Sequence, residues 1–203
     1  RFERLNGSLL LNHRKKNLNL FGDYSVLHSR TWMEHLGDMR ISNEGIVSLW
    51  DFNSHNYGRR QTHNARLGFD YSLGANTVIG GLLSGFSNGF YGDANRLTNI
   101  RRNGLLVEQS AMTDDGKDIW QHQMVNGNVR HTFAGKQQLS LDVDYLRYNN
   151  QNPHDYTNLS AFPQKGTSQT DLTNIKKESP IQIWVLKADY SQALGKLHRL
   201  DVG

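Results

Sequence analysis

The sequence predicts an all-β protein, a segment of an antiparallel, up-and-down β-barrel that spans a membrane. Polar and apolar residues alternate over long stretches, most clearly over 138–145. Four short polar turns, centred on Lys15, Ala75, Gly135 and Gly195, follow one another at a constant spacing of 60 residues. Short turns that alternate with much longer connections are typical of outer-membrane barrels. We therefore expect about eight strands, with short periplasmic turns and long extracellular loops.

A pair of strands flanks each turn. The clearest strand places Leu139, Leu141, Val143 and Tyr145 on one face and Asp142 and Asp144, among others, on the opposite face. A helical period would bring both aspartates round to the apolar side, so this stretch is a strand. In order along the chain, the expected strands are 9–13, 18–26, 64–73, 77–90, 125–133, 138–145, 184–191 and 197–202, and the expected turns are 14–17, 74–76, 134–136 and 194–196.

The three long connections, 34–58, 91–117 and 149–179, are polar and charged. We expect extracellular loops there, with turn signals at Asn103-Gly104 and Asp115-Gly116 and with strand extensions at 45–52 and 105–110. One helical turn over 33–39 is disfavoured by Gly37. The connection 149–179 is either a surface that contacts a ligand or a lipoprotein lid, or an unconstrained outer loop.

Composition narrows the class of protein. The chain has 203 residues, 36% of them hydrophobic, a mean hydropathy of −0.66 and no apolar run of the roughly 18 residues of a membrane helix. A strand of a membrane barrel exposes only every second side chain to lipid, so a low mean hydropathy is compatible with a membrane barrel. The absence of cysteine excludes disulfides and thiolate metal sites. The net charge of +4 is spread out without a basic stripe, so we expect no nucleic-acid partner.

Six aromatic residues lie toward strand ends, where a membrane barrel carries its interfacial belts. Ordinary cross-strand packing in a soluble sandwich is the alternative explanation. The six residues are Trp32, Trp120, Tyr145, Tyr148, Trp184 and Tyr190.

No residue is assigned a catalytic, cofactor-binding or metal-binding role, and we expect neither a cofactor nor enzymatic activity. His122 and His131 are nine residues apart, hence on opposite faces of a regular strand, which argues against a shared metal. Asp142 and Asp144 share a face about 7 Å apart, as an acid–base pair would. A charge ladder inside a wet barrel is favoured, because cations lie on the neighbouring polar faces: Arg66, Arg130, Lys187 and Arg199.

Four segments carry a resemblance to a known family: 8–25 (SLLLNHRKKNLNLFGDYS), 63–71 (HNARLGFDY), 139–148 (LSLDVDYLRY) and 186–190 (LKADY). They resemble hairpins and strands of Bacteroidetes outer-membrane β-barrel proteins of the TonB-dependent receptor superfamily. The resemblance implies a barrel of about 22 strands, closed by a plug domain that engages TonB and drives uptake with the inner-membrane proton gradient. The plug, the TonB-contacting segment and the carboxy-terminal aromatic strand have no counterpart in these residues.

We therefore expect residues 1–203 to be a single barrel segment, cut at both ends, in the cell outer membrane. Its function would be to form the wall of a TonB-dependent receptor that takes up a substrate. Expected partners are outer-membrane lipid and, by resemblance, a plug domain, TonB and a surface lipoprotein. Two alternatives stay open: a small closed eight-stranded barrel that serves as an anchor or adhesin, and a soluble β-sandwich binding module.

Overall fold

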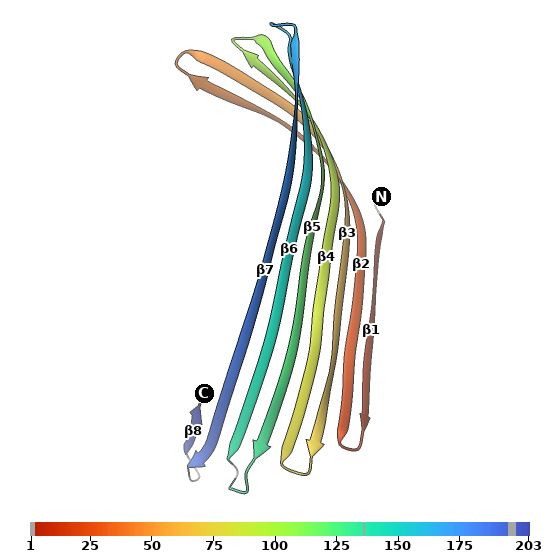
Figure 1. Ribbon diagram of the computed structural model, residues 1–203, viewed down its shortest axis with the longest axis vertical. Helices are drawn as coiled ribbons and strands as arrows, with labels where there is room; N and C mark the ends of the chain where they lie inside the picture. Colours follow the sequence, from red (N-terminus) through yellow and green to blue (C-terminus); the bar gives the residue numbers. More distant parts are fainter. Residues whose placement is uncertain (1–2, 136, 195–197) are drawn as a thin grey trace.

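Eight antiparallel strands form one sheet, in which each strand pairs with its neighbours in the sequence (Figure 1). The computed structural model describes residues 3–135, 137–194 and 198–203. The strands are β1 (Arg4–Lys15), β2 (Leu18–Asn43), β3 (Ile46–Leu73), β4 (Thr77–Arg102), β5 (Leu105–Thr132), β6 (Gln138–Phe162), β7 (Thr167–Leu194) and β8 (His198–Val202). The expected all-β, up-and-down architecture is confirmed.

The short turns lie together at one end of the sheet (Figure 1). Lys16 and Gly74 have positive φ angles of 53° and 70°, the backbone shape that a tight turn requires. The turn 74–76 falls between β3 and β4 as expected, and the first turn lies between Lys15 and Leu18. Lys136 of the third expected turn, and Gly195 and Lys196 of the fourth, lie outside the described residues.

The three long connections are not irregular loops, so that part of the expectation is wrong. They are the far halves of long hairpins, because β2 to β7 run for 25 to 28 residues each. The hairpins close at Glu44-Gly45 and Asn103-Gly104, both with two positive φ angles, and at residues 163–166. Asp115-Gly116 lies inside β5, and 33–39 is strand. Polar residues are compatible with these extensions because both faces of a strand beyond the lipid are wet, while hydrogen bonds to the neighbouring strands still pair the backbone N–H and C=O groups between β2 and β7.

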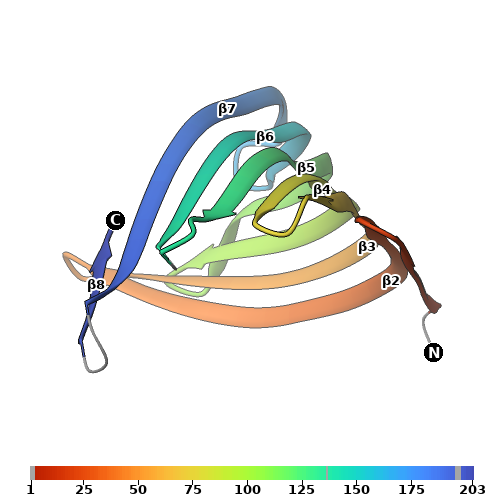
Figure 2. The same ribbon diagram turned by 90° about the horizontal axis from the view of Figure 1, so that it is seen from below.

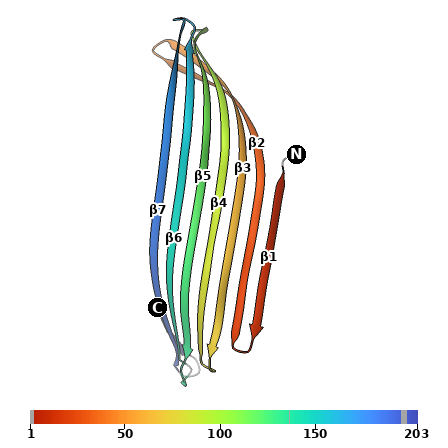
Figure 3. The ribbon, with the colours of Figure 1, turned by 45° about the vertical axis from the view of Figure 1, so that its right-hand side comes forward.

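The length of the strands exceeds what a membrane requires. A strand of 28 residues is about 90 Å long, whereas a crossing takes about 10 residues. Figure 3 shows the strands running side by side as one tall, bent wall. Only the part nearest the short turns is needed to cross the bilayer.

The sheet is open. Among the described residues β1 pairs with β2 and β8 with β7, and no ladder joins β1 to β8 (Figure 2). One hydrophobic side chain, Ile100, is buried in this part of the chain, so there is no second sheet and no apolar core. The soluble sandwich is therefore wrong as an alternative. No helix in the described ranges is long and apolar enough to cross a membrane.

Candidate functional site

The end of the sheet nearest the short turns has an outer face made of apolar side chains. Cross-strand partners share a face, so the register sorts the residues directly. One face of this region carries Leu67, Leu83 and Leu186, which are 62%, 54% and 78% exposed. The same face continues through Leu20, Phe69, Ile79, Val125, Val129, Leu141 and Val143. So many exposed leucines and valines on one face are unfavourable in water. They therefore mark a belt that faces lipid, here called the apolar belt.

The upper edge of the apolar belt runs obliquely across the strands. On β1 the belt reaches Leu5. The row of cross-strand partners that begins at Leu5 crosses the sheet at right angles to the strands and ends at Glu178 on β7. On β7 itself the belt ends at Trp184, six residues nearer the short turns. At about 3.3 Å per residue and 4.8 Å per strand, this slope corresponds to strands tilted by about 35°, the tilt of membrane barrels. The belt is therefore level in the membrane when the strands tilt as a barrel requires.

The opposite, inner face of the same region carries most of its charged and amide side chains, several of them hydrogen-bonded to one another. The Arg66 Nε atom donates to the Asp23 carboxylate at 2.7 Å, and the Asn126 amide donates to Asp144 at 2.6 Å. Farther from the membrane this face carries the buried Ser54, Ser160 and Ile100, so it is the crowded, concave side. The inner face thus has the chemistry of a wet barrel interior.

Half of the expected aromatic belt is confirmed. Tyr145 and Trp184 pack on the outer face with ring centroids 4.7 Å apart, and Tyr190 lies on the same face nearer the short turns. The assignment of Trp120 and Tyr148 to the aromatic belt is wrong, because the register turns both side chains to the inner face. Trp32 lies on the outer face but well beyond the apolar belt. Tyr24 and Tyr71, which the sequence reading missed, complete the outer belt.

The two histidines lie on opposite faces, as expected. His122 packs on the inner face between Phe86 and Tyr148, with ring centroids 5.5 and 4.4 Å away. His131 lies on the outer face, with its Nδ1 atom 2.7 Å from the Thr77 hydroxyl. Within the described ranges no group of three or more potential ligands has the geometry of a metal site.

Asp142 and Asp144 share the inner face, and each has its own surroundings. Asp144 accepts from Asn126, and Asp142 lies opposite Lys187. The Lys187 ammonium itself lies 2.7 Å from Asp189. Arg66 pairs with Asp23 and Arg199 with Asp201, and Arg130 lies on the same inner face. This is a ladder of charges and amides, as favoured over an acid–base pair.

A second inner-face cluster, centred on His154, was missed by the sequence reading. The His154 ring lies 2.9 Å from Asp114 and 3.7 Å from Asp118, and stacks on Tyr156 at 5.7 Å. The hydrogen bond to Asp114 raises the pKa of His154 against the opposing effect of burial. Burial, with Asp114 and Asp118 nearby, raises the pKa of Tyr156. The spacing of Asp114 and Asp118 does place both on one face of β5. Their partner His154, however, is about 40 residues away in the sequence, and only the pairing of β5 with β6 reveals the contact.

A known protein family matches the carboxy-terminal part of this chain. Residues 131–203 match the model of an outer membrane protein beta-barrel family. The chain is a segment of an outer-membrane β-barrel. It is thus located in the outer membrane, as expected.

Solved structures give only distant likenesses. A membrane pore complex of pneumolysin is 8% identical with a TM-score of 0.17, over 93% of this chain and 31% of that one. A triple mutant of the Rhodopseudomonas blastica porin is 6% identical with a TM-score of 0.11, over 89% and 100%. This chain thus spans about a third of the pneumolysin chain. TM-scores this low do not establish a shared fold or function. Comparison with curated protein sequences finds no match.

Proposed function

We propose that this barrel segment forms part of the wall of a TonB-dependent receptor and takes part in the uptake of a substrate across the outer membrane. The observation that carries the proposal is a two-sided wall with both edges open. β1 and β8 each have one partner strand among the described residues. Such a wall becomes a barrel when further strands pair with both edges.

The open sheet and its charged inner face support a barrel of more than eight strands. A closed barrel of eight strands has an interior that side chains fill. Here the inner face presents hydrated pairs such as Asp23–Arg66, with the two side chains 34% and 53% exposed. Charged pairs on this face suit an interior that holds water, a plug domain or a passing solute. The small anchor or adhesin therefore ranks second.

The resemblance of residues 8–25, 63–71, 139–148 and 186–190 supplies the TonB-dependent part of the proposal. Uptake of this type draws on the inner-membrane proton gradient through TonB, whereas a passive porin or an anchor does not.

A binding experiment separates these possibilities. The full-length protein that contains this chain is incubated in detergent with the purified periplasmic domain of TonB, with a porin as the matched control. We expect the full-length protein to retain TonB and the porin not to. If it retains no TonB, and deletion of its gene leaves TonB-dependent growth unchanged, the receptor proposal fails and the anchor takes its place.

A further inference from the structure

A row of glycines crosses the sheet beyond the apolar belt. Gly58, Gly92 and Gly116 are successive cross-strand neighbours on β3, β4 and β5, and His154 continues the row on β6. This row is here called the glycine line. A glycine in a strand has no side chain to pack and weakens the strand. Three of them at one height therefore make the glycine line a place where the wall can bend.

The pairing of β5 with β6 is interrupted at the same height. It stops at Gly116↔His154 and resumes at Ile119, so that residues 117–118 have no ladder partner on β6. Pro153 lies in this gap, and a proline has no N–H to donate to a ladder. Missing side chains and missing ladder hydrogen bonds thus coincide, which marks the glycine line as the weakest line across the sheet.

The inner side of the glycine line is filled by an aromatic ring. The Phe90 side chain lies where side chains of Gly58 and Gly92 would stand, and a methyl group added at Gly58 would lie 2.5 Å from that ring. A bend toward the inner face would press this ring against the backbone. Movement in that direction is therefore blocked.

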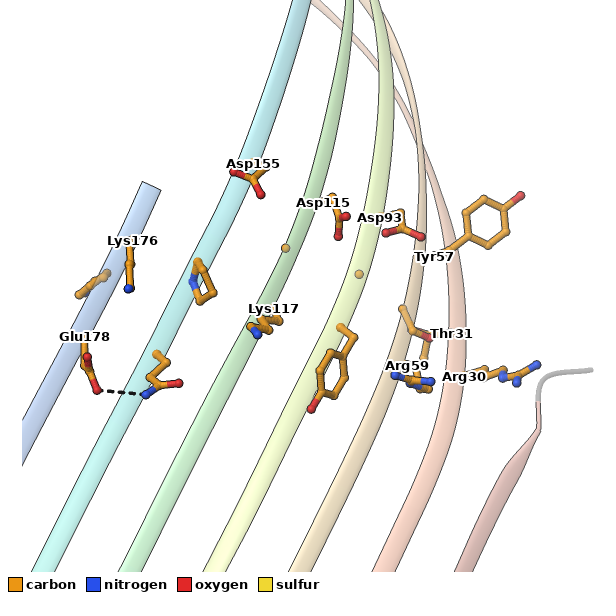
Figure 4. A pocket seen from close by; sticks show the side chains of 17 residues that line it. Arg30, Thr31, Tyr57, Arg59, Asp93, Asp115, Lys117, Asp155, Lys176 and Glu178 are labelled. Atoms are coloured by element: carbon orange, nitrogen blue, oxygen red, sulfur yellow. Dashed lines mark hydrogen bonds between the residues drawn. The ribbon is translucent and has the colours of Figure 1, made fainter. Parts of the chain in front are cut away.

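The outer side of the glycine line is open. A hollow of about 1090 Å³ lies there, and all three glycines line it (Figure 4). Arg59 and Lys117 border the hollow on the side nearer the membrane, and Asp93 and Asp115 border it on the far side. A bend toward the outer face meets open space and brings opposite charges closer together, so this is the direction in which the wall can move.

His154 spans the glycine line on the inner face. Its ring lies over Gly116, with its Nδ1 atom 2.9 Å from Asp114 beyond the line and its Nε2 atom 3.7 Å from Asp118 on the membrane side. Asp118 also accepts a hydrogen bond from the Asn152 amide. A protonated imidazole has an N–H on both nitrogens and can bind both carboxylates, whereas a neutral one has a single N–H.

The proton on His154 is the one that changes this contact. Tyr156 stacks on the ring from β6, and burial together with the two carboxylates raises the pKa of Tyr156, so its phenol stays neutral. On β7 the neighbouring charged group is Lys177, one inner-face position nearer the membrane than the direct partner of His154. The hydrogen bond to Asp114 raises the pKa of His154. The ring is therefore charged below about pH 6.5 and loses its charge as pH rises through the raised value.

From these observations we propose that the glycine line is a hinge, about which the far half of the wall moves outward, and that protonated His154 locks it. With both carboxylates bound, the ring ties the two halves of β5 together. Once the proton leaves, the contact with Asp118 is lost, the wall bends toward the hollow, and the extracellular mouth of the barrel widens. The hinge requires only this wall, so it is independent of the proposed uptake.

The test measures the bend by pulsed electron paramagnetic resonance on the full-length protein in nanodiscs. Spin labels are attached at Ala111→Cys and Gln121→Cys, with every other cysteine replaced by serine. Both positions are on the outer face of β5, one on each side of the glycine line, about 33 Å apart along the strand. Bending toward the hollow brings the labels together. We expect the share of the shorter distance to rise about fivefold from pH 5.5 to pH 9, the size of one partly exposed ion pair.

Two variants and one control assign the lock to His154. His154→Gln cannot carry the charge, so it should show the shorter distance at both pH values. The matched control His122→Gln makes the same substitution on the inner face, between Phe86 and Tyr148, and should keep the pH dependence. Asp118→Asn removes only the contact on the membrane side and should show the shorter distance already at pH 5.5. This variant decides the outcome if His154→Gln does not assemble.

Several results would overturn the hinge. Equal distances at both pH values in the wild-type protein, or a longer distance at pH 9, would contradict the outward bend. A pH dependence that survives in His154→Gln, disappears in His122→Gln, or is unchanged in Asp118→Asn would contradict the role of His154. None of these measurements involves TonB, so a failure here is distinct from a failure of the receptor proposal.

Discussion

A charge placed in the centre of the apolar belt gives the sharpest test of the two-sided wall. Leu141 is an outward residue near the middle of the belt on β6, and its cross-strand partners are Val129 and Ala188. No countercharge lies beside it in this row. Its neighbour Ser140 points to the inner face, where it borders a hollow of about 360 Å³ and lies opposite Arg130 and Asp189. Leu141→Arg and Ser140→Arg therefore add the same side chain to opposite faces.

The expected magnitudes differ strongly. An arginine at the midplane of the bilayer costs about 2–4 kcal/mol on the lipid face, and the loss of the leucine's own contact with lipid adds roughly 1 kcal/mol. Leu141→Arg should therefore destabilise the barrel by about 4 kcal/mol. In Ser140→Arg the new guanidinium has water and Asp189 as partners, so the expected cost is below about 1 kcal/mol.

The assay is a urea titration of the full-length protein in phospholipid vesicles, followed by heat-modifiable migration on a gel. Leu139→Arg, one outward position nearer the short turns, is the depth control and should cost less than Leu141→Arg. Equal costs at positions 140 and 141, or a larger cost at 140, would refute the assignment of the faces.

The remaining predictions concern packing, pH and sidedness. Gly68→Ala should destabilise by about 1–3 kcal/mol, because the added methyl meets the Phe21 ring at 2.5 Å and the Gly81 carbonyl at 3.0 Å, whereas Gly127→Ala, with nothing within 4 Å, should be nearly neutral in the same titration. The pKa of His154 is raised in the folded state, so its pairing with Asp114 stabilises the β5–β6 hairpin below about pH 6.5 and loses that effect as pH rises through the raised value; the protection factor of amides near Asp114, which corrects for the faster intrinsic exchange at high pH, should be larger at pH 6 than at pH 9 by an amount worth about 1 kcal/mol, and Asp114→Asn should abolish this difference in protection. Residues 1–203 contain no cysteine, so single cysteines placed here report sidedness against the unsubstituted protein as the blank: Asn103→Cys and Gln164→Cys should react with a membrane-impermeant maleimide on intact cells and Asn76→Cys should not, and the reverse pattern would invert the orientation of the barrel.

The sequence by itself determined the fold class and, where polar and apolar residues alternate cleanly, the faces of the membrane-spanning strands; over 77–90 both faces carry apolar residues, and only the register turned Ile79 and Leu83 outward. Alternation over 138–145 and the equally spaced turns at 15, 75 and 135 are local features, and a pleated strand converts each of them directly into an orientation. For the same reason, the placement of His122 and His131 on opposite faces and of Asp142 and Asp144 on one face was predictable from the spacing of residues alone.

Only the tertiary structure decided how far the strands extend and which distant residues meet. Beyond the lipid both faces are wet, so alternation fades, and the ladder from Thr31↔Gly58 to Asn43↔Ile46 is set by backbone hydrogen bonds that leave no mark on side-chain type. The same register places Arg59, Tyr91 and Lys117 in one row and brings His154 between Asp114 and Asp118. Turns with equal spacing along the sequence therefore predict a wall, and the cross-strand pairing of residues decides what that wall presents to the lipid and to the interior.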